Sequence, residues 1–138
     1  MSGKRVLSIG QCLADHSALS RTFQKNFGAE VVSADSEAEA LALLRQEPFH
    51  LVLVNRVLNA DGSSGVRVIQ EIRQQENLTQ VPVMLVSNYE DAQQEALAAG
   101  ALPGFGKSSL GHPRMLARVK EVLGEGGPVN RLDNVNVR

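Results

Sequence analysis

The segment LVLVNRVLNADGSSGVRVIQEIR, residues 51–73, decides the fold. It opens with an unbroken apolar run at residues 51–54, which is typical of a parallel strand covered on both faces. A polar loop containing an Asp-Gly pair follows. Apolar side chains then recur at helical spacing, at Val68, Ile69 and Ile72, behind Gly65. The segment therefore predicts a strand, a loop and a helix in succession, which is the repeating unit of a parallel α/β sheet.

The same alternation extends in both directions from this segment. Short runs rich in Val, Leu and Ile predict four strands. A fifth strand is expected at residues 102–105, although Pro103 and the nearby glycines disfavour a strand there. Five such units in succession, joined by right-handed crossovers, predict a doubly wound parallel sheet. The five expected strands lie at residues 6–9, 31–32, 51–54, 81–86 and 102–105.

Helix starts and stops fall between these runs. Leu19, Phe23 and Phe27 recur at helical spacing in the first helix, and Ser36 with Glu39 has the form of a capping box for the second. Further expected boundary residues are Gly28 after the first helix, Asn88 before and Gly100 after the fourth, and Pro113 and Gly124 around the fifth.

Length and charge limit the classes of protein. The 138 residues carry 14 Lys and Arg against 15 Asp and Glu, so the near-neutral balance gives no electrostatic case for nucleic acid or an anionic membrane as partner. One domain is expected over residues 1–123, with residues 124–138 as a flexible tail or linker. No apolar run has the length of a membrane span, and a cytoplasmic location is expected.

Metal, thiol and nucleotide chemistry find little support. The single Cys12 permits no internal disulfide, and its expected role is that of a small buried side chain. Three scattered histidines lack the paired spacing of metal ligands, so no metal or other cofactor is expected. The triplet Gly106-Lys107-Ser108 ends like a phosphate-binding loop, but the upstream glycine is out of register.

Polar residues at the carboxyl ends of the strands are the candidate site, because ligands of open parallel sheets bind there. They are Gly10, Gln11 and Cys12, Asn55 and Arg56, Ser87 and Asn88, and Lys107.

At these positions the sequence resembles the receiver domains of response regulators. The resemblance covers roughly residues 4–123 and rests on KRVLSIGQ, EALALLRQEPFHLVLVN, NADGSSGVRVIQEIR, VPVMLVSN and EALAAGAL followed by Lys107. It implies a flavodoxin-like (βα)5 fold with strand order 2-1-3-4-5. It also implies a two-component signalling role with a kinase, an output domain or a second copy as partner.

The departures from that family are concentrated at the site. The resemblance places Gly10 and Gln11 at the acidic pair, Asn55 at the phosphoacceptor aspartate, Ser87 at the hydroxyl position and Lys107 at the lysine. An amide cannot form an acyl phosphate, and a hard divalent cation needs anionic oxygen ligands. We therefore expect a pseudo-receiver that is not an enzyme and acts through protein contacts.

Each retained residue also has a structural interpretation. Lys107 is expected as a solvated or backbone-capping side chain, Ser87 as a turn residue, and Asn55 as a hydrogen-bonding filler. Asp15 is expected to cap the first helix, and Asp61 to stabilise a turn.

Three functions stay open at this point. The leading one is a signalling module whose contact face comprises the fourth helix, fifth strand and fifth helix, with residues 92–97, Phe105 and residues 116–122. The second is a flavodoxin-like domain that binds a small ligand or anion in the strand-end crevice. The third is an active receiver that uses Asp15 or Asp61 as an unexpected acceptor.

Overall fold

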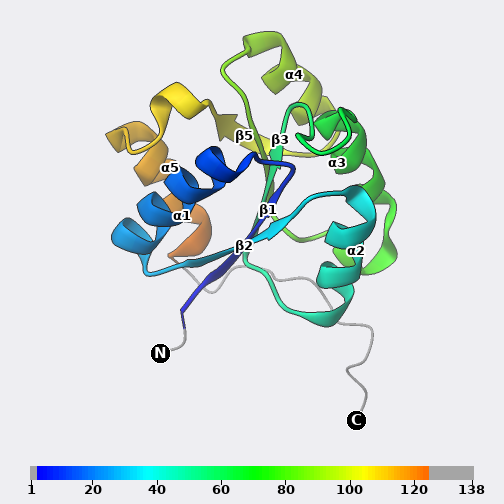
Figure 1. Ribbon diagram of the computed structural model, residues 1–138, viewed down its shortest axis with the longest axis horizontal. Helices are drawn as coiled ribbons and strands as arrows, with labels where there is room; N and C mark the ends of the chain where they lie inside the picture. Colours follow the sequence, from blue (N-terminus) through cyan, green and yellow to red (C-terminus); the bar gives the residue numbers. More distant parts are fainter. Residues whose placement is uncertain (1–2, 125–138) are drawn as a thin grey trace.

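The computed structural model describes residues 3–124, which form a parallel five-stranded sheet between two layers of helices (Figure 1). The strand order is β2-β1-β3-β4-β5, and every neighbouring pair is parallel. The predicted strand order and fold class are confirmed. The strands are β1 (Arg5–Ile9), β2 (Glu30–Ala34), β3 (Leu51–Asn55), β4 (Val83–Val86) and β5 (Leu102–Phe105).

Helices cover both faces of the sheet. α1 and α5 pack on one face, while α2, α3 and α4 pack on the other (Figure 1). Short 3-10 turns follow α3 and β5. The helices are α1 (Leu13–Phe27), α2 (Glu37–Gln46), α3 (Gly65–Gln74), α4 (Glu90–Ala98) and α5 (Pro113–Leu123), and the 3-10 turns are η1 (Glu76–Leu78) and η2 (Lys107–Ser109).

The continuous apolar run of β3 reflects burial on both of its faces. Leu51 and Leu53 pack with the α1 and α5 layer, whereas Val52 and Val54 pack with the other layer. All four side chains have no exposed surface. Because both faces are covered, no polar alternation is possible here, which is why the run predicts a central strand correctly.

Most of the predicted helix boundaries are confirmed. Gly28 ends α1 with a left-handed φ of 62°, and Ser36 Oγ accepts a hydrogen bond from Glu39 N at the start of α2. Pro113 occupies the first turn of α5. The prediction that Asn88 caps α4 is wrong. Tyr89 holds the N-cap position without a side-chain bond, because the Asn88 side chain is engaged elsewhere.

β5 forms despite its proline and glycines. Between Met84 and Val86 the pairing with β5 shifts register, which accommodates one extra residue. Gln93 of α4 bridges the irregularity: its Nε2 donates to Leu85 O, and its Oε1 accepts from Gly104 N. A Cβ at Gly104 would lie 2.1 Å from Leu85 O, so only glycine allows this close approach.

The expected tail at residues 124–138 lies, apart from Gly124, outside the described residues. Within residues 3–124, no helix has the length and apolarity needed to cross a membrane.

Candidate functional site: the strand-end crevice

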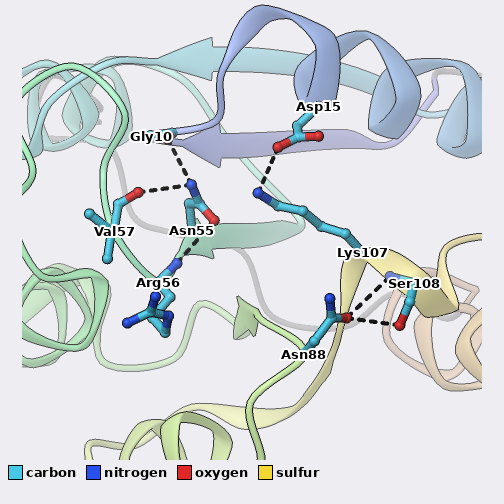
Figure 2. A network of polar contacts seen from close by, with 8 residues as sticks. All are labelled: Gly10, Asp15, Asn55, Arg56, Val57, Asn88, Lys107 and Ser108. Carbon is cyan, nitrogen blue, oxygen red and sulfur yellow. Dashed lines mark hydrogen bonds and ion pairs between the residues drawn. The ribbon is translucent and has the colours of Figure 1, made fainter.

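The predicted site residues meet where β1, β3, β4 and β5 end, as expected for an open parallel sheet. A hollow of about 230 Å³ lies between the ends of β3, β4 and β5. Side chains at the ends of β3, β4 and β5 approach one another at this edge, together with Asp15 of α1 (Figure 2). The hollow is lined by Asn55, Arg56, Val57, Val86, Ser87, Asn88, Tyr89 and Lys107.

Asn55, at the end of β3, is held by three hydrogen bonds (Figure 2). Its Nδ2 donates to Gly10 O at 3.1 Å and to Val57 O at 2.8 Å, while its Oδ1 accepts from Arg56 N at 3.1 Å. Both amide hydrogens are thereby used on backbone carbonyls. A carboxylate could make neither of these donations, since it only accepts hydrogen bonds. The geometry is therefore specific for an amide at position 55.

Gly10, directly after β1, is fixed by backbone conformation and by its neighbour. Its φ is +80°, and a Cβ there would lie 2.5 Å from Leu58 Cγ. Its amide and carbonyl are both bonded, to Ala34 O and from Asn59 N. A side chain at this position would displace the loop after β3, so the absence of an acid here is part of the packing.

Gln11 follows at the second position of the expected acidic pair. It is 8% exposed, and neither oxygen nor nitrogen of its side chain has a hydrogen-bond partner among the described residues. Burial of an unpaired amide costs free energy, whereas burial of an unpaired carboxylate costs much more. A glutamine side chain therefore costs less folding free energy at this buried position than a carboxylate would.

The donor set does not fit the divalent cation that receiver domains bind. Gly10 offers no side chain, Gln11 a buried neutral amide, and Asn55 an amide whose hydrogens face the protein. Mg²⁺ prefers carboxylate oxygens and gives up water reluctantly. Over residues 3–124, no three His, Cys, Asp or Glu side chains group together in a way that could hold a metal ion.

Lys107, the lysine after β5, pairs with α1 instead of with the end of β3. Its Nζ lies 2.6 Å from Asp15 Oδ2 (Figure 2). The hydrogen bond from this ammonium group lowers the pKa of Asp15 below its usual value, with a smaller contribution from Cys12. The expectation that Asp15 caps α1 is wrong: the helix begins at Leu13, Cys12 is its N-cap residue, and no side chain makes a cap bond. The aspartate is drawn to Lys107 because a full charge is a stronger partner than a backbone amide.

Neutral hydrogen bonds hold the loops that follow β4 and β5. Ser87 Oγ accepts from Tyr89 N, which confirms its expected role in a turn. Asn88 Oδ1 accepts from both the backbone N and the Oγ of Ser108 (Figure 2). A proline at position 108 would have neither the N–H nor the hydroxyl that these two bonds use. Ser108 therefore makes a link between the two loops that proline could not make.

Arg56 and Tyr89 form a contact that sequence reasoning missed. The Arg56 guanidinium carbon lies 4.7 Å from the centroid of the Tyr89 ring, in cation–π geometry. Both residues are exposed, and both line the crevice as well as a larger hollow of about 490 Å³ beside α4. The only sequence signal was their position one residue after β3 and three residues after β4.

The structure also tests the expected roles of Asp61 and Cys12. Asp61 Oδ1 accepts from the N and Oγ of Ser63, so Asp61 stabilises the loop as predicted. These bonds lower its pKa. Cys12 is only half-buried and forms a side-chain hydrogen bond with Asp15, so its expected role as a small buried side chain is wrong.

The fold, the strand order and the site at this edge define a doubly wound α/β domain of the flavodoxin-like class. The response regulator receiver domain matches residues 14–120, more than half of the sequence. The chain belongs to the receiver-domain family of two-component signalling proteins. No curated protein matches the sequence closely.

Solved structures agree with this assignment. A response regulator from Thermotoga maritima is 25% identical with a TM-score of 0.69, covering 90% of this chain and 100% of that one. The chemotaxis response regulator CheY4 of Vibrio cholerae is 22% identical with a TM-score of 0.69, covering 88% and 100%. NtrX from Brucella abortus is 20% identical with a TM-score of 0.73, covering 89% of this chain and 27% of that longer one.

Proposed function

We propose that this receiver domain transmits a signal through protein contacts, without phosphorylation at position 55 and without enzymatic activity of its own. The observation that carries the proposal is the pair of hydrogen bonds from Asn55 Nδ2 to Gly10 O and Val57 O. Receiver domains in general interact with kinases or output domains, so we expect a protein partner to bind this one.

The chemistry of the crevice supports the proposal. Aspartyl phosphorylation needs a carboxylate nucleophile and a divalent cation that neutralises the phosphoryl oxygens. Asn55 supplies an amide whose nitrogen lone pair is delocalised, and the cation ligands are missing. Asp15 and Asp61 are poor substitutes for a phosphoacceptor at position 55. Asp15 is paired with Lys107, and Asp61 is hydrogen-bonded to Ser63 in an exposed loop.

The expected contact face of α4, β5 and α5 needs a correction at the level of residues. Ala92, Ala96, Phe105 and Val119, all within the expected set, are buried in the core and cannot contact a partner. The large apolar side chains exposed on this side are Leu97, 37% exposed on α4, and Leu102, 38% exposed on β5. We propose that a cytoplasmic kinase, output domain or second copy of the chain contacts this pair.

Phosphorylation is tested directly by incubation with acetyl phosphate and Mg²⁺, followed by intact-mass measurement. An active receiver domain in the same tube serves as the positive control. The expected result is a phosphate adduct on the control and none on this chain. A stoichiometric adduct on this chain would falsify the proposal, and peptide mapping would then show which side chain accepted the phosphoryl group.

A second candidate function is anion binding in the same crevice. The 230 Å³ hollow has no carboxylate among its lining residues, and the Arg56 guanidinium has no ion-pair partner within residues 3–124. Against it, Lys107 is neutralised by Asp15 and the Asn55 amide hydrogens are occupied. Thermal unfolding with inorganic phosphate or flavin mononucleotide tests it, since a bound ligand raises the midpoint as its concentration rises.

A further inference from the structure

A groove far from the strand-end crevice lies between the second half of α1 and the edge strand β2. Its volume is about 560 Å³, and its lining includes Ala29 and Val31 together with Arg21 and Lys25. Ala29 and Val31 are 1% and 8% exposed, so the apolar part of the lining is recessed. The groove thus offers apolar surface to a side chain that is inserted into it.

The charge around this groove is positive and unbalanced. Arg21 and Lys25 lie one helical turn apart on α1, both are exposed, and neither has an ion-pair partner among the described residues. Glu30 also lines the groove, and Arg5 Nη1 lies 3.5 Å from its Oε1, although the same guanidinium also pairs with Glu47. The two cations of α1 therefore outnumber the single carboxylate in the lining and can attract an external acid.

β2 adds backbone groups to the groove. Within residues 3–124 it is the first strand of the sheet and pairs only with β1, so no described strand lies along its other edge. An extended segment can pair with such an edge and place alternate side chains toward the groove.

We propose that the α1–β2 groove binds an extended acidic segment of a partner protein, with carboxylates on Arg21 and Lys25 and an apolar side chain over Val31. A flat anionic bilayer fits less well, because it would meet the basic side chains but could not reach the recessed apolar surface. The α1–β2 groove is separate from α4 and β5. Binding of an acidic segment there does not depend on which protein contacts the exposed pair on α4 and β5.

The test uses the whole 138-residue chain labelled with ¹⁵N and the fluorescent octapeptide Glu-Ser-Leu-Ser-Glu-Ser-Leu-Ser, which in extended form places Glu and Leu on the same face. Two matched peptides carry Gln in place of Glu, or Ala in place of Leu. The expected result is saturable binding of the first peptide, with amide shifts concentrated at Arg21, Gln24, Lys25 and Val31. Both matched peptides should bind at least about tenfold more weakly.

A charge-reversed variant, Arg21→Glu with Lys25→Glu, should lose binding by at least about tenfold. Its matched control, Arg67→Glu with Lys120→Glu, changes the net charge equally on α3 and α5 and should bind like the wild type. Urea unfolding checks that both variants fold.

Several outcomes would overturn the inference. They are no binding of the acidic peptide, equal loss of binding in the two double variants, or shifts located outside α1 and β2. Binding to phosphatidylglycerol vesicles in preference to the peptide would assign the groove to a membrane instead. Self-association that the Arg21→Glu, Lys25→Glu variant abolishes would assign it to a second copy of the chain.

Discussion

The two halves of the strand-end crevice differ in how they hold their residues. At the ends of β1 and β3, Gly10, Asn55 and Leu58 are fixed by backbone conformation, close contact and bonds to backbone carbonyls. At the ends of β4 and β5, Lys107 is held by one ion pair between partly exposed side chains. The first half is part of the folded core, whereas the second is a set of surface interactions.

This difference separates two ways of departing from the family pattern. In the β1–β3 half the acids are missing because the surrounding packing leaves no room or no suitable partner for them. In the β4–β5 half Ser87 and Lys107 keep the expected residue types but have partners within the domain. Substitutions in the first half should therefore cost folding free energy, while those in the second should be tolerated.

The largest effect is expected for Gly10→Ala. The added Cβ would lie 2.5 Å from Leu58 Cγ and 2.9 Å from Leu58 Cα, at a φ of +80°. Left-handed strain and overpacking together should reduce the free energy of unfolding by about 4 kcal/mol. Urea denaturation followed by circular dichroism measures this loss.

Gly62→Ala is the matched control for that experiment. Gly62 also has a positive φ, +74°, but nothing lies within 4 Å of its Cβ position. It should lose only about 1 kcal/mol, from strain alone. Equal losses in the two variants would show that the contact with Leu58 does not restrict position 10, and the proposed rigidity of the β1–β3 half would be wrong.

Asn55→Asp should have the next largest effect, about 2–3 kcal/mol at pH 7. The change removes two donated hydrogen bonds and points a carboxylate at Gly10 O and Val57 O. Those carbonyls disfavour the charged form, so we expect the pKa of the new Asp side chain to be raised in the folded state. The destabilisation should be small at low pH, grow once the pH passes the unfolded pKa near 3.9, and be complete above the folded pKa.

The measurement is urea unfolding of wild type and Asn55→Asp at a series of pH values. Asn59→Asp provides the control, because this exposed neighbour uses only its backbone N–H, in a bond to Gly10 O. It should show neither the loss nor the pH dependence. A stable Asn55→Asp protein at pH 7 would mean that the amide is not required by the fold.

The sequence predicts the strands and the residues at their ends, but not the partners that these residues find in distant loops. The strands were predictable because β3 and β4 are buried on both faces, and continuous apolar runs report that burial directly. The positions of Gly10, Asn55 and Lys107 at one edge follow from the topology. The partners of Lys107 and Asn88 were not predictable, because each depends on a loop distant in sequence. Local capping rules, which favour Asp15 and Asn88 at helix starts, ignore such competing partners.

The smallest effect is expected for the Lys107–Asp15 pair. The side chains are 40% and 34% exposed, so solvent screening should limit their coupling to about 0.5 kcal/mol at low salt. A double-mutant cycle with Asp15→Asn and Lys107→Met measures it, and 1 M NaCl should reduce it. Lys107 lowers the pKa of Asp15, so the coupling should be present above the unfolded pKa and disappear as the pH falls through the folded one.

A control cycle combines Lys107→Met with Asp61→Asn, whose carboxylate bonds only to Ser63, and it should give no coupling. A Lys107–Asp15 coupling of several kcal/mol, insensitive to salt, would contradict the comparison between the two halves. It would mean that this ion pair is shielded from solvent and fixes the loop after β5 as firmly as Gly10 and Asn55 fix the loop after β3. The β4–β5 half would then be a rigid part of the core rather than a set of surface contacts that a partner could rearrange.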